Sequence, residues 1–231
     1  MKMIRRILEI VVVLVGLVLI WPLLLLTSLL IKWTSSGPVL FAQTRIGRRG
    51  RAFTIYKFRS MVPGADKLGS SVTTGVDRRI TGIGRFLRRS KLDELPQLWN
   101  VLTGDMSLVG PRPEVPEIVA YYTPAMRRIL EARPGITSIA SLYLRDEENI
   151  LAAFDHPDSV YINRIVPFKV ALAMEHVDRQ SLWYDLKILI MTVYGVSLGR
   201  WWPIGELDEV REFKKNLLMQ YKSKELYRET F

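Results

Sequence analysis

The chain begins with an unbroken apolar segment, and its hydrophobic positions become periodic only after that segment. Residues Ile10 to Ile31 carry no charge over 22 positions, with the basic residues Lys2, Arg5 and Arg6 before them and Lys32 after them. At about 1.5 Å per residue, a helix of this length extends about 33 Å, enough to cross the core of a bilayer. The pattern therefore predicts a membrane helix.

Two features favour a helix that enters the membrane, breaks and returns. Pro22 lies in the middle of the segment, where it removes a helix hydrogen bond and kinks the chain, and basic residues at both flanks place both ends on the cytoplasmic side. We therefore expect a re-entrant helix over residues 1–36, with its membrane break at Pro22. A plain spanning signal-anchor is the alternative. A cleaved signal peptide is disfavoured, because the apolar run is too long and Ala-x-Ala is missing.

The rest of the chain predicts one domain, over residues 37–205, and a charged helical tail over residues 206–231. Two β-like runs, Val39 to Arg45 and Ala52 to Phe58, flank a glycine-containing turn and predict a hairpin. From Arg78 to Lys91, apolar residues keep helical spacing while arginines fill the other faces, which is typical of an amphipathic helix in the membrane interface. We therefore expect an α+β fold, mainly helical, in a monotopic membrane protein.

Positive charge is concentrated in one stretch of the chain. The net charge is +10, and between Phe41 and Lys91 there are 13 basic residues against 2 acidic ones. Such a stripe suits anionic lipid, a phosphorylated substrate or nucleic acid, but the apolar segment directly before it disfavours nucleic acid as a partner. The chain has no cysteine and only two histidines, which excludes thiol catalysis and leaves oxygen chemistry.

Two adjacent carboxylates, Asp93 and Glu94, lie between basic residues and a Pro-Arg-Pro turn. Because Pro96 suits the first turn of a helix, we expect the acid pair at the N-terminus of that helix, where free amides favour anions. A carboxylate can attack phosphorus only when the target's charge is neutralised, and arginines with a divalent cation do this. One acid is therefore a candidate nucleophile and the other a magnesium ligand; helix capping is the alternative. Basic residues are expected on both sides of the pair, with Arg112 on one side and, on the other, Arg85, Arg88, Arg89 and Lys91.

Six motifs resemble, in the same order, those of the bacterial sugar transferase family, the monotopic polyprenyl-phosphate phosphoglycosyl transferases. The motifs are Gly37 to Phe41, Arg45 to Gly47, Tyr56 to Met61, Leu92 to Asn100, Gly104 to Glu114 and Pro134 to Thr137. The resemblance covers roughly residues 1–199. It departs at Trp21, where the family commonly has Ser before the proline, and at Ser138-Ile139, where the family usually has Gly-Trp.

The resemblance implies a reaction and a role for each acid. Asp93 would attack the β-phosphate of a nucleotide diphosphate sugar, expected to be a UDP-sugar, and expel UMP from a covalent phosphosugar-aspartate. A polyprenyl phosphate carrier, undecaprenyl phosphate, would then take the phosphosugar and start polysaccharide assembly. Glu94 would hold Mg²⁺ against the diphosphate. The side chains that would bind substrate phosphate are Arg88, Arg112, Lys57 and Arg59.

Other candidates are weaker. Pro111 and Pro113 stiffen the turn that presents Arg112, which lowers the cost of ordering it, and Glu114 either pairs with Arg112 or starts the next helix. Trp201 and Trp202 suit the headgroup zone.

The expected location is the inner, cytoplasmic membrane of a bacterium, with the catalytic domain facing the cytoplasm. A second copy of the chain is left open as a partner of the charged tail. One alternative function is a membrane-anchored basic scaffold that binds anionic lipid, which needs neither the acid pair nor magnesium. The other is a basic nucleic-acid-binding protein, which would bind DNA or RNA with a steep dependence on salt and show no specificity for a sugar nucleotide.

Overall fold

The computed structural model describes residues 2–70, 72–74, 77–197 and 207–229 of the chain. Within these residues helices dominate, accompanied by two sheets of two strands each. The mainly helical class and the hairpin that the sequence predicts are confirmed. Trp201 and Trp202 lie outside the described residues.

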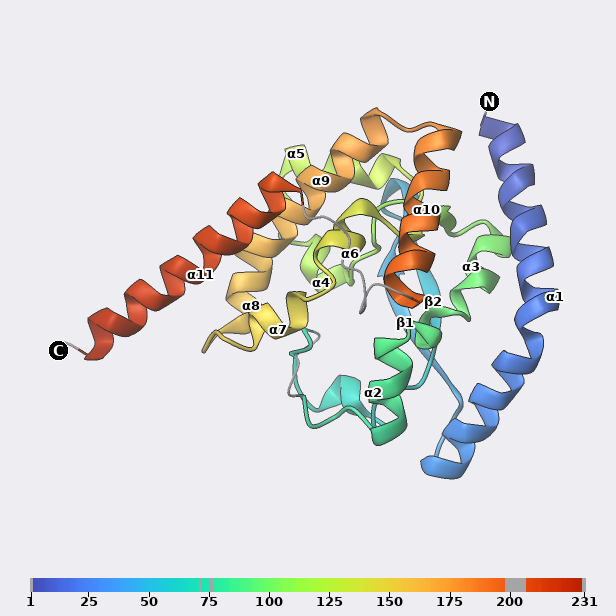
Figure 1. Cartoon of the computed structure of the whole chain (residues 1–231), viewed down its shortest axis with the longest axis horizontal. Helices are drawn as coiled ribbons and strands as arrows, with labels where there is room; N and C mark the ends of the chain where they lie inside the picture. Colours follow the sequence, from blue (N-terminus) through green and yellow to red (C-terminus); the bar gives the residue numbers. More distant parts are fainter. Residues whose placement is uncertain (1, 71, 75–76, 198–206, 230–231) are drawn as a thin grey trace.

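The first helix, α1 (Lys2–Thr34), runs along one side of the domain (Figure 1). It is helical without interruption through Pro22, so the predicted break amounts to a bend in its axis, which Figure 1 shows in its C-terminal half. A stripe that includes Val13 and Ile31 is buried against the domain, whereas Leu19 on another face is 73% exposed. Among the described helices, this one alone has the length and apolar composition needed to cross a membrane.

Both ends of α1 contact the same domain. Near the start, the Arg5 guanidinium lies 3.0 Å from the Asp185 carboxylate, and Arg6 donates a hydrogen bond of 3.4 Å to the backbone oxygen of Met106. Near the end, Ile31 is fully buried and packs in an apolar cluster of the domain. The basic residues at the N-terminal flank are therefore docking contacts as well as flanking charges.

The hairpin consists of β1 (Leu40–Ile46) and β2 (Ala52–Phe58), which pair antiparallel. A short turn, η1 (Arg48–Gly50), joins them with Arg49 in the left-handed region at φ 59°. Ile55 points into a cluster that also takes up Val13 of α1. The hairpin thereby packs on α1, and the side chain of Lys57 in β2 lines a large cavity.

A second sheet, which the sequence did not predict, pairs β3 (Ser107–Val109) with β4 (Gly135–Thr137) in parallel. Several short helical segments connect the strands and surround the site. Their bounds are η2 Ala65–Lys67, α2 Gly82–Arg89, η3 Leu92–Glu94, α3 Gln97–Thr103, α4 Pro116–Val119, α5 Pro124–Arg127, η4 Arg128–Glu131, α6 Ile139–Tyr143, α7 Glu147–Leu151 and α8 Pro157–Val160. The C-terminal part is helical, with a π-helical turn η5 Tyr161–Ile165, α9 Val166–Asp178, α10 Leu182–Ser197 and α11 Asp208–Glu229.

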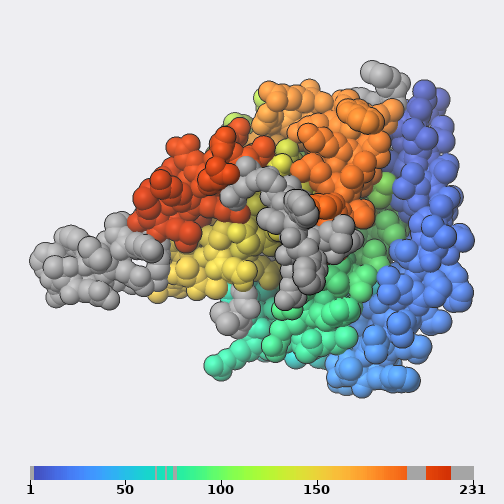
Figure 2. All heavy atoms as spheres, in the orientation of Figure 1, coloured from blue at the N-terminus to red at the C-terminus, as the bar shows by residue number. Residues whose placement is uncertain are grey.

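The predicted charged tail is helical and its first part packs on the domain. In α11, Val210 is fully buried and Leu217 is nearly so. The ring of Phe213 stacks on that of Phe168 in α9, with 3.9 Å between centroids. Figure 2 shows this part of α11, in red, against the orange and yellow helices. Contacts with a second copy are therefore not needed to explain the apolar residues of this part of the tail.

At Gly84, the backbone of α2 lies close against the backbone of Ser60, beside the site. A Cβ atom at this position would lie 1.8 Å from the backbone oxygen of Ser60, whereas one at Gly82 would meet nothing within 4 Å. We expect Gly84→Ala to lower the free energy of unfolding by about 1–3 kcal/mol, the usual cost of overpacking. The matched Gly82→Ala should raise it by about 0.5–1 kcal/mol by stiffening the unfolded chain. Thermal unfolding in detergent measures both, and equal transition temperatures would contradict this account.

Candidate active site

Asp93 and Glu94 lie in a 3-10 turn, η3, directly before α3. Lys91 enters this turn with a left-handed backbone at φ 56°, and Pro96 stands at the N-terminal boundary of α3. Both acids are buried, at 5% and 8% exposure. The sequence therefore placed the pair correctly relative to the helix. The burial of two adjacent carboxylates demands a physical explanation, since each loses solvation that must be replaced.

Two cationic side chains replace the solvation that the Glu94 carboxylate loses on burial. Arg112 donates to both of its carboxylate oxygens, at 3.0 and 3.4 Å, and Lys57 donates to one at 3.4 Å. Burial raises the pKa of Glu94, but Arg112 and Lys57 outweigh burial and hold this pKa well below its usual range. Burial in turn lowers the pKa of Lys57 to about 8, against the attraction of Glu94. Glu94 is therefore a stable anion that orients two cations.

Asp93 is in a different situation. Its Oδ1 atom is buried and has no hydrogen-bond partner among the described residues. Burial, followed by the charge of Glu94, raises the pKa of Asp93. An unpartnered carboxylate oxygen in a protein interior is costly, and such atoms are found where a substrate or ion completes the site. The two acids therefore differ physically, and Asp93 is the one with a free oxygen.

Asp93 lines a cavity of about 300 Å³ beside the hairpin. Its wall combines apolar side chains with an excess of basic ones, a composition that suits a phosphorylated ligand. The basic residues in the wall are Arg45, Lys57, Arg59, Arg79, Arg88 and Arg112. The structure thus brings together Asp93 and all four of the predicted phosphate-binding side chains. Glu94 lies behind the wall and reaches the cavity only through Lys57 and Arg112.

Two of the predicted phosphate-binding residues already have partners. Arg59 is buried and donates to the backbone oxygen and the Oγ of Ser35, at 3.0 and 2.6 Å, which ties the cavity to the end of α1. Its Nε and Nη1 have no partner among the described residues. Arg88 forms an ion pair with Glu148 of α7. Both guanidinium groups are therefore held in place and keep N–H groups available for an anion.

The expectation that Arg85 and Arg89 gather with Arg88 at the site is wrong. Both are exposed on α2, and neither lines the cavity. Successive residues of a helix point about 100° apart, so Arg88 and Arg89 cannot face the same side. Only Arg88 from this helix reaches the cavity.

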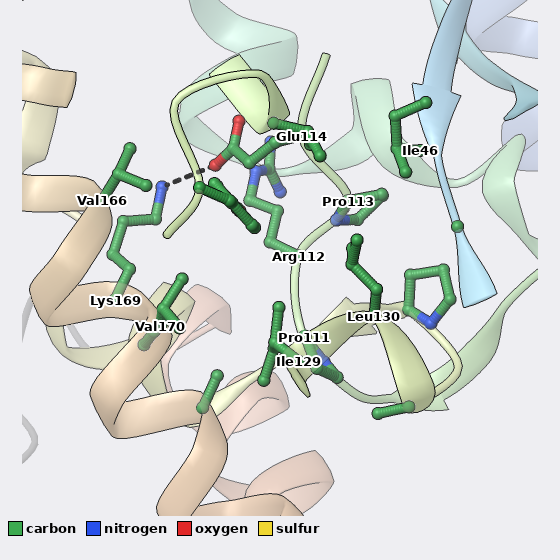
Figure 3. Close-up of a pocket in the computed structure, with 17 residues that line it drawn as sticks. Ile46, Pro111, Arg112, Pro113, Glu114, Ile129, Leu130, Val166, Lys169 and Val170 are labelled. Carbon is green, nitrogen blue, oxygen red and sulfur yellow. Dashed lines mark hydrogen bonds and ion pairs between the residues drawn. The ribbon is translucent and has the colours of Figure 1, made fainter. Parts of the chain in front are cut away.

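The Pro-Arg-Pro turn also lines a small cavity of about 40 Å³, whose lining residues are drawn in Figure 3. Pro111, Pro113 and Glu114 line the small cavity together with Arg112. Glu114 is buried at 8% exposure, and its carboxylate lies 3.7 Å from the Arg45 guanidinium, which also donates to the backbone oxygen of Pro113 at 3.1 Å. Glu114 also lines the large cavity; it holds the turn through Arg45 and forms no ion pair with Arg112.

The sequence did not single out the groups that hold Glu114. Tyr161 donates its hydroxyl hydrogen to Glu114 at 2.7 Å, and the Lys169 ammonium lies 3.4 Å from the same oxygen; Figure 3 shows Lys169 reaching toward it from α9. One signal for Lys169 was present in the sequence, because it is a single charge inside the apolar run Val166 to Met174. Lysine is rarely buried unless it is paired.

The residues present fit a magnesium ion in one specific way. No group of three or more His, Asp or Glu side chains that could hold a metal occurs among the residues that the structure describes. Magnesium typically binds through one or two carboxylates, with water and substrate phosphate completing its shell. The free oxygen of Asp93 meets part of that requirement. Both carboxylate oxygens of Glu94 are engaged by Arg112 and Lys57, so Glu94 could reach the ion only if one of these contacts were released.

The apolar helix and the basic cavity together define a membrane-associated protein with a site suited to a phosphorylated substrate. Residues 1–199 match the profile of the family described as bacterial sugar transferase, so the chain belongs to this family. The resemblance that the sequence motifs predicted is confirmed.

Several bacterial relatives are similar to this chain. A UDP-N-acetylgalactosamine-undecaprenyl-phosphate N-acetylgalactosaminephosphotransferase of Aeromonas hydrophila is 36% identical over 85% of the chain and 44% of its own length. UDP-glucose:undecaprenyl-phosphate glucose-1-phosphate transferases of Caulobacter vibrioides and Escherichia coli are 39% and 37% identical, over 82% and 84% of the chain. The chain spans 68% of the length of the Caulobacter relative and 40% of that of the Escherichia coli relative.

Proposed function

We propose that this protein transfers a phosphosugar from a UDP-sugar to undecaprenyl phosphate, and so starts the assembly of a membrane polysaccharide. The observation that carries the proposal is the free, buried oxygen of Asp93 in a basic cavity. Family membership and the substrates in the names of the relatives support it. These names include both UDP-glucose and UDP-N-acetylgalactosamine, so the sugar is a matter for experiment.

The reaction proceeds in two displacements at one phosphorus atom. A carboxylate oxygen of Asp93 attacks the β-phosphorus, the bond to the bridging oxygen breaks, and UMP leaves with the electron pair. An oxygen of undecaprenyl phosphate then attacks the same phosphorus, and the Asp93 carboxylate leaves with its electrons restored. The product is undecaprenyl diphosphate sugar. Neither step needs a redox partner.

The basic residues stabilise charge during both displacements. Arg112 and Lys57, oriented by Glu94, neutralise the phosphate that Asp93 approaches, since an anion cannot attack another anion unless its charge is offset. Arg88 and Arg59 take up the remaining phosphate charge with their free N–H groups. Glu94, with Asp93 beside it, would hold Mg²⁺, which supplies further neutralisation of the diphosphate when bound.

We further propose that α1 is re-entrant and that both of its ends lie on the cytoplasmic face of the inner membrane. The docking of Arg5 at one end and of Ile31 at the other on one domain supports this, because a spanning helix would separate these contacts by a bilayer. The exposed apolar residues between them would lie in lipid. The acceptor phosphate would then be at the headgroup level, beside the cavity, with the donor in the cytoplasm.

Single cysteines test this topology, because the chain has none of its own. We expect Met3→Cys and Ser36→Cys, both at exposed positions, to react with a membrane-impermeant maleimide in inside-out vesicles and not in intact spheroplasts. Leu19→Cys should be protected in both preparations. Labelling of either end from the outer face would show a spanning helix and contradict the proposal.

The function itself is tested by nucleotide release. Full-length protein in detergent, with undecaprenyl phosphate and magnesium, is supplied with each of a panel of UDP-sugars, and UMP is measured. We expect release with at least one donor. Absence of release with every donor, from protein that is folded, would reject the proposal in favour of a lipid-binding scaffold.

A further inference from the structure

Lys169 of α9 lies between two carboxylates from separate parts of the chain. Its ammonium is 3.4 Å from Glu114, after the Pro-Arg-Pro turn, and 3.1 Å from Glu147 at the start of α7. Only 8% of the Lys169 side chain is exposed. A buried cation shared by two anions holds their separation tightly, because moving either one leaves charge unpaired in a medium of low dielectric.

Each of these carboxylates is next to an arginine of the large cavity. Glu114 follows Arg112 by two residues, with a rigid proline between them. Glu147 precedes Glu148, which forms the ion pair with Arg88. Lys169 therefore links the segment that carries Arg112 to the segment that holds Arg88. Lys169 is not among the described residues that line the large cavity.

The helix that carries Lys169 is built for this contact. Tyr161 and Lys169 are eight residues apart, so in a regular α-helix they would point about 80° apart, at about 100° per residue. The π-helical turn η5 begins at Tyr161. It rotates less about the helix axis per residue than an α-helix does, which reduces the angle between the two side chains. Lys169 thereby reaches the Tyr161 hydroxyl at 3.0 Å, and the same hydroxyl donates to Glu114 at 2.7 Å.

We propose that Lys169, aligned with Tyr161 by the π-helical turn, is a positioning residue that sets the separation between Arg112 and Arg88. This rests on the proposed function, which assigns both arginines to the donor diphosphate. Both guanidinium groups line the large cavity, so their spacing determines how well one diphosphate binds between them. The attraction of Tyr161, Glu147 and Glu114 outweighs burial and raises the pKa of Lys169, which keeps it charged at neutral pH.

The test measures binding of UDP and of inorganic diphosphate to the full-length protein in detergent, by calorimetry, alongside donor kinetics. We expect Lys169→Met to weaken both ligands by about tenfold and to raise the donor KM by a similar factor, as the loss of one well-placed charge-assisted contact does. The kcat should stay within about threefold, and Lys169→Arg should recover most of the affinity. Wild-type affinity in Lys169→Met, or a loss confined to kcat, would overturn the inference.

Three further variants separate positioning from folding. Tyr161→Phe removes only the hydroxyl and should weaken both ligands by about threefold. Because Tyr161 also lines the large cavity, the inference further requires that Lys169→Gln, which removes the charge without changing the cavity wall, weakens both ligands; this variant also serves where Lys169→Met fails to fold. Ile165→Val, in the same π-helical turn and also buried, should lower stability and leave binding unchanged. If Ile165→Val weakens binding as much as Tyr161→Phe, the effect is structural and the inference fails.

The binding data also separate this inference from the proposed function. If wild type binds diphosphate but turns over no UDP-sugar, the proposed function fails, while the comparison of variants still decides the role of Lys169. If wild type turns over a donor and Lys169→Met matches it in affinity and KM, only the inference fails. If wild type binds neither UDP nor diphosphate, both fail.

Discussion

Asp93→Asn should abolish UMP release, with turnover reduced by about 10⁴-fold or more, as is usual when a nucleophile is removed. The amide has nearly the shape of the carboxylate but lacks its negative charge, so it cannot attack phosphorus. Its effect on folding should be small, because the Oδ1 atom has no hydrogen-bond partner to lose. The burial that raises the pKa of Asp93 also favours a neutral side chain at this position.

Intact-protein mass spectrometry checks the same prediction without turnover. Wild type incubated with the donor alone should gain the mass of one phosphosugar, and Asp93→Asn should gain none. Asp208→Asn serves as the control, since its carboxylate is almost fully exposed on α11, and it should behave as wild type. An adduct on Asp93→Asn, or turnover above a tenth of the wild-type rate, would assign the attack to another group.

The sequence predicted the elements whose signal is local. The apolar run of α1 and the paired β-like runs of the hairpin depend on neighbouring residues, and both are present as expected. Pro96 marks the start of α3 for the same reason, since its fixed backbone suits a helix N-terminus. The clustering of basic residues around the acid pair singled out Arg88 and Arg112, and the family resemblance added the expectation that both bind phosphate.

The contacts that the sequence did not predict are those between distant segments. Lys169 is 55 residues from Glu114, and no local pattern indicates that they meet. The strands β3 and β4 have three residues each, too short for a periodic signal. A helical pattern also cannot tell which of its polar faces meets the protein, so Arg88 and Arg89 looked equivalent in the sequence although only Arg88 lines the cavity.

The distinct surroundings of the two acids explain how one turn can hold both. Glu94 is paired with Lys57 and Arg112, which partly offsets the negative charge that Asp93 has beside it. Substitution of Glu94 would therefore affect Asp93 indirectly, through the two cations, as well as through any bound metal. These two effects of Glu94 can be told apart by experiment.

We expect Glu94→Gln to lower kcat/KM by about 10²-fold or more, because Arg112 and Lys57 lose the group that orients them toward the phosphate. The amide leaves Arg112 and Lys57 as uncompensated neighbours and removes a carboxylate from the proposed magnesium site. If Glu94 is a magnesium ligand, the magnesium concentration that half-saturates UDP binding should rise by about tenfold. Calorimetry of UDP binding across a magnesium titration measures this without turnover.

The control is Glu175→Gln, which removes a carboxylate from an exposed ion pair on α9 and should leave the magnesium titration unchanged. An unchanged titration in Glu94→Gln, together with weaker UDP binding, would mean that Glu94 acts only by orienting Arg112 and Lys57. In that case the metal would have to depend on Asp93 and the diphosphate, because a hard cation needs anionic oxygen ligands. The two outcomes therefore decide whether Glu94 binds the metal or only supports the cations that line the cavity.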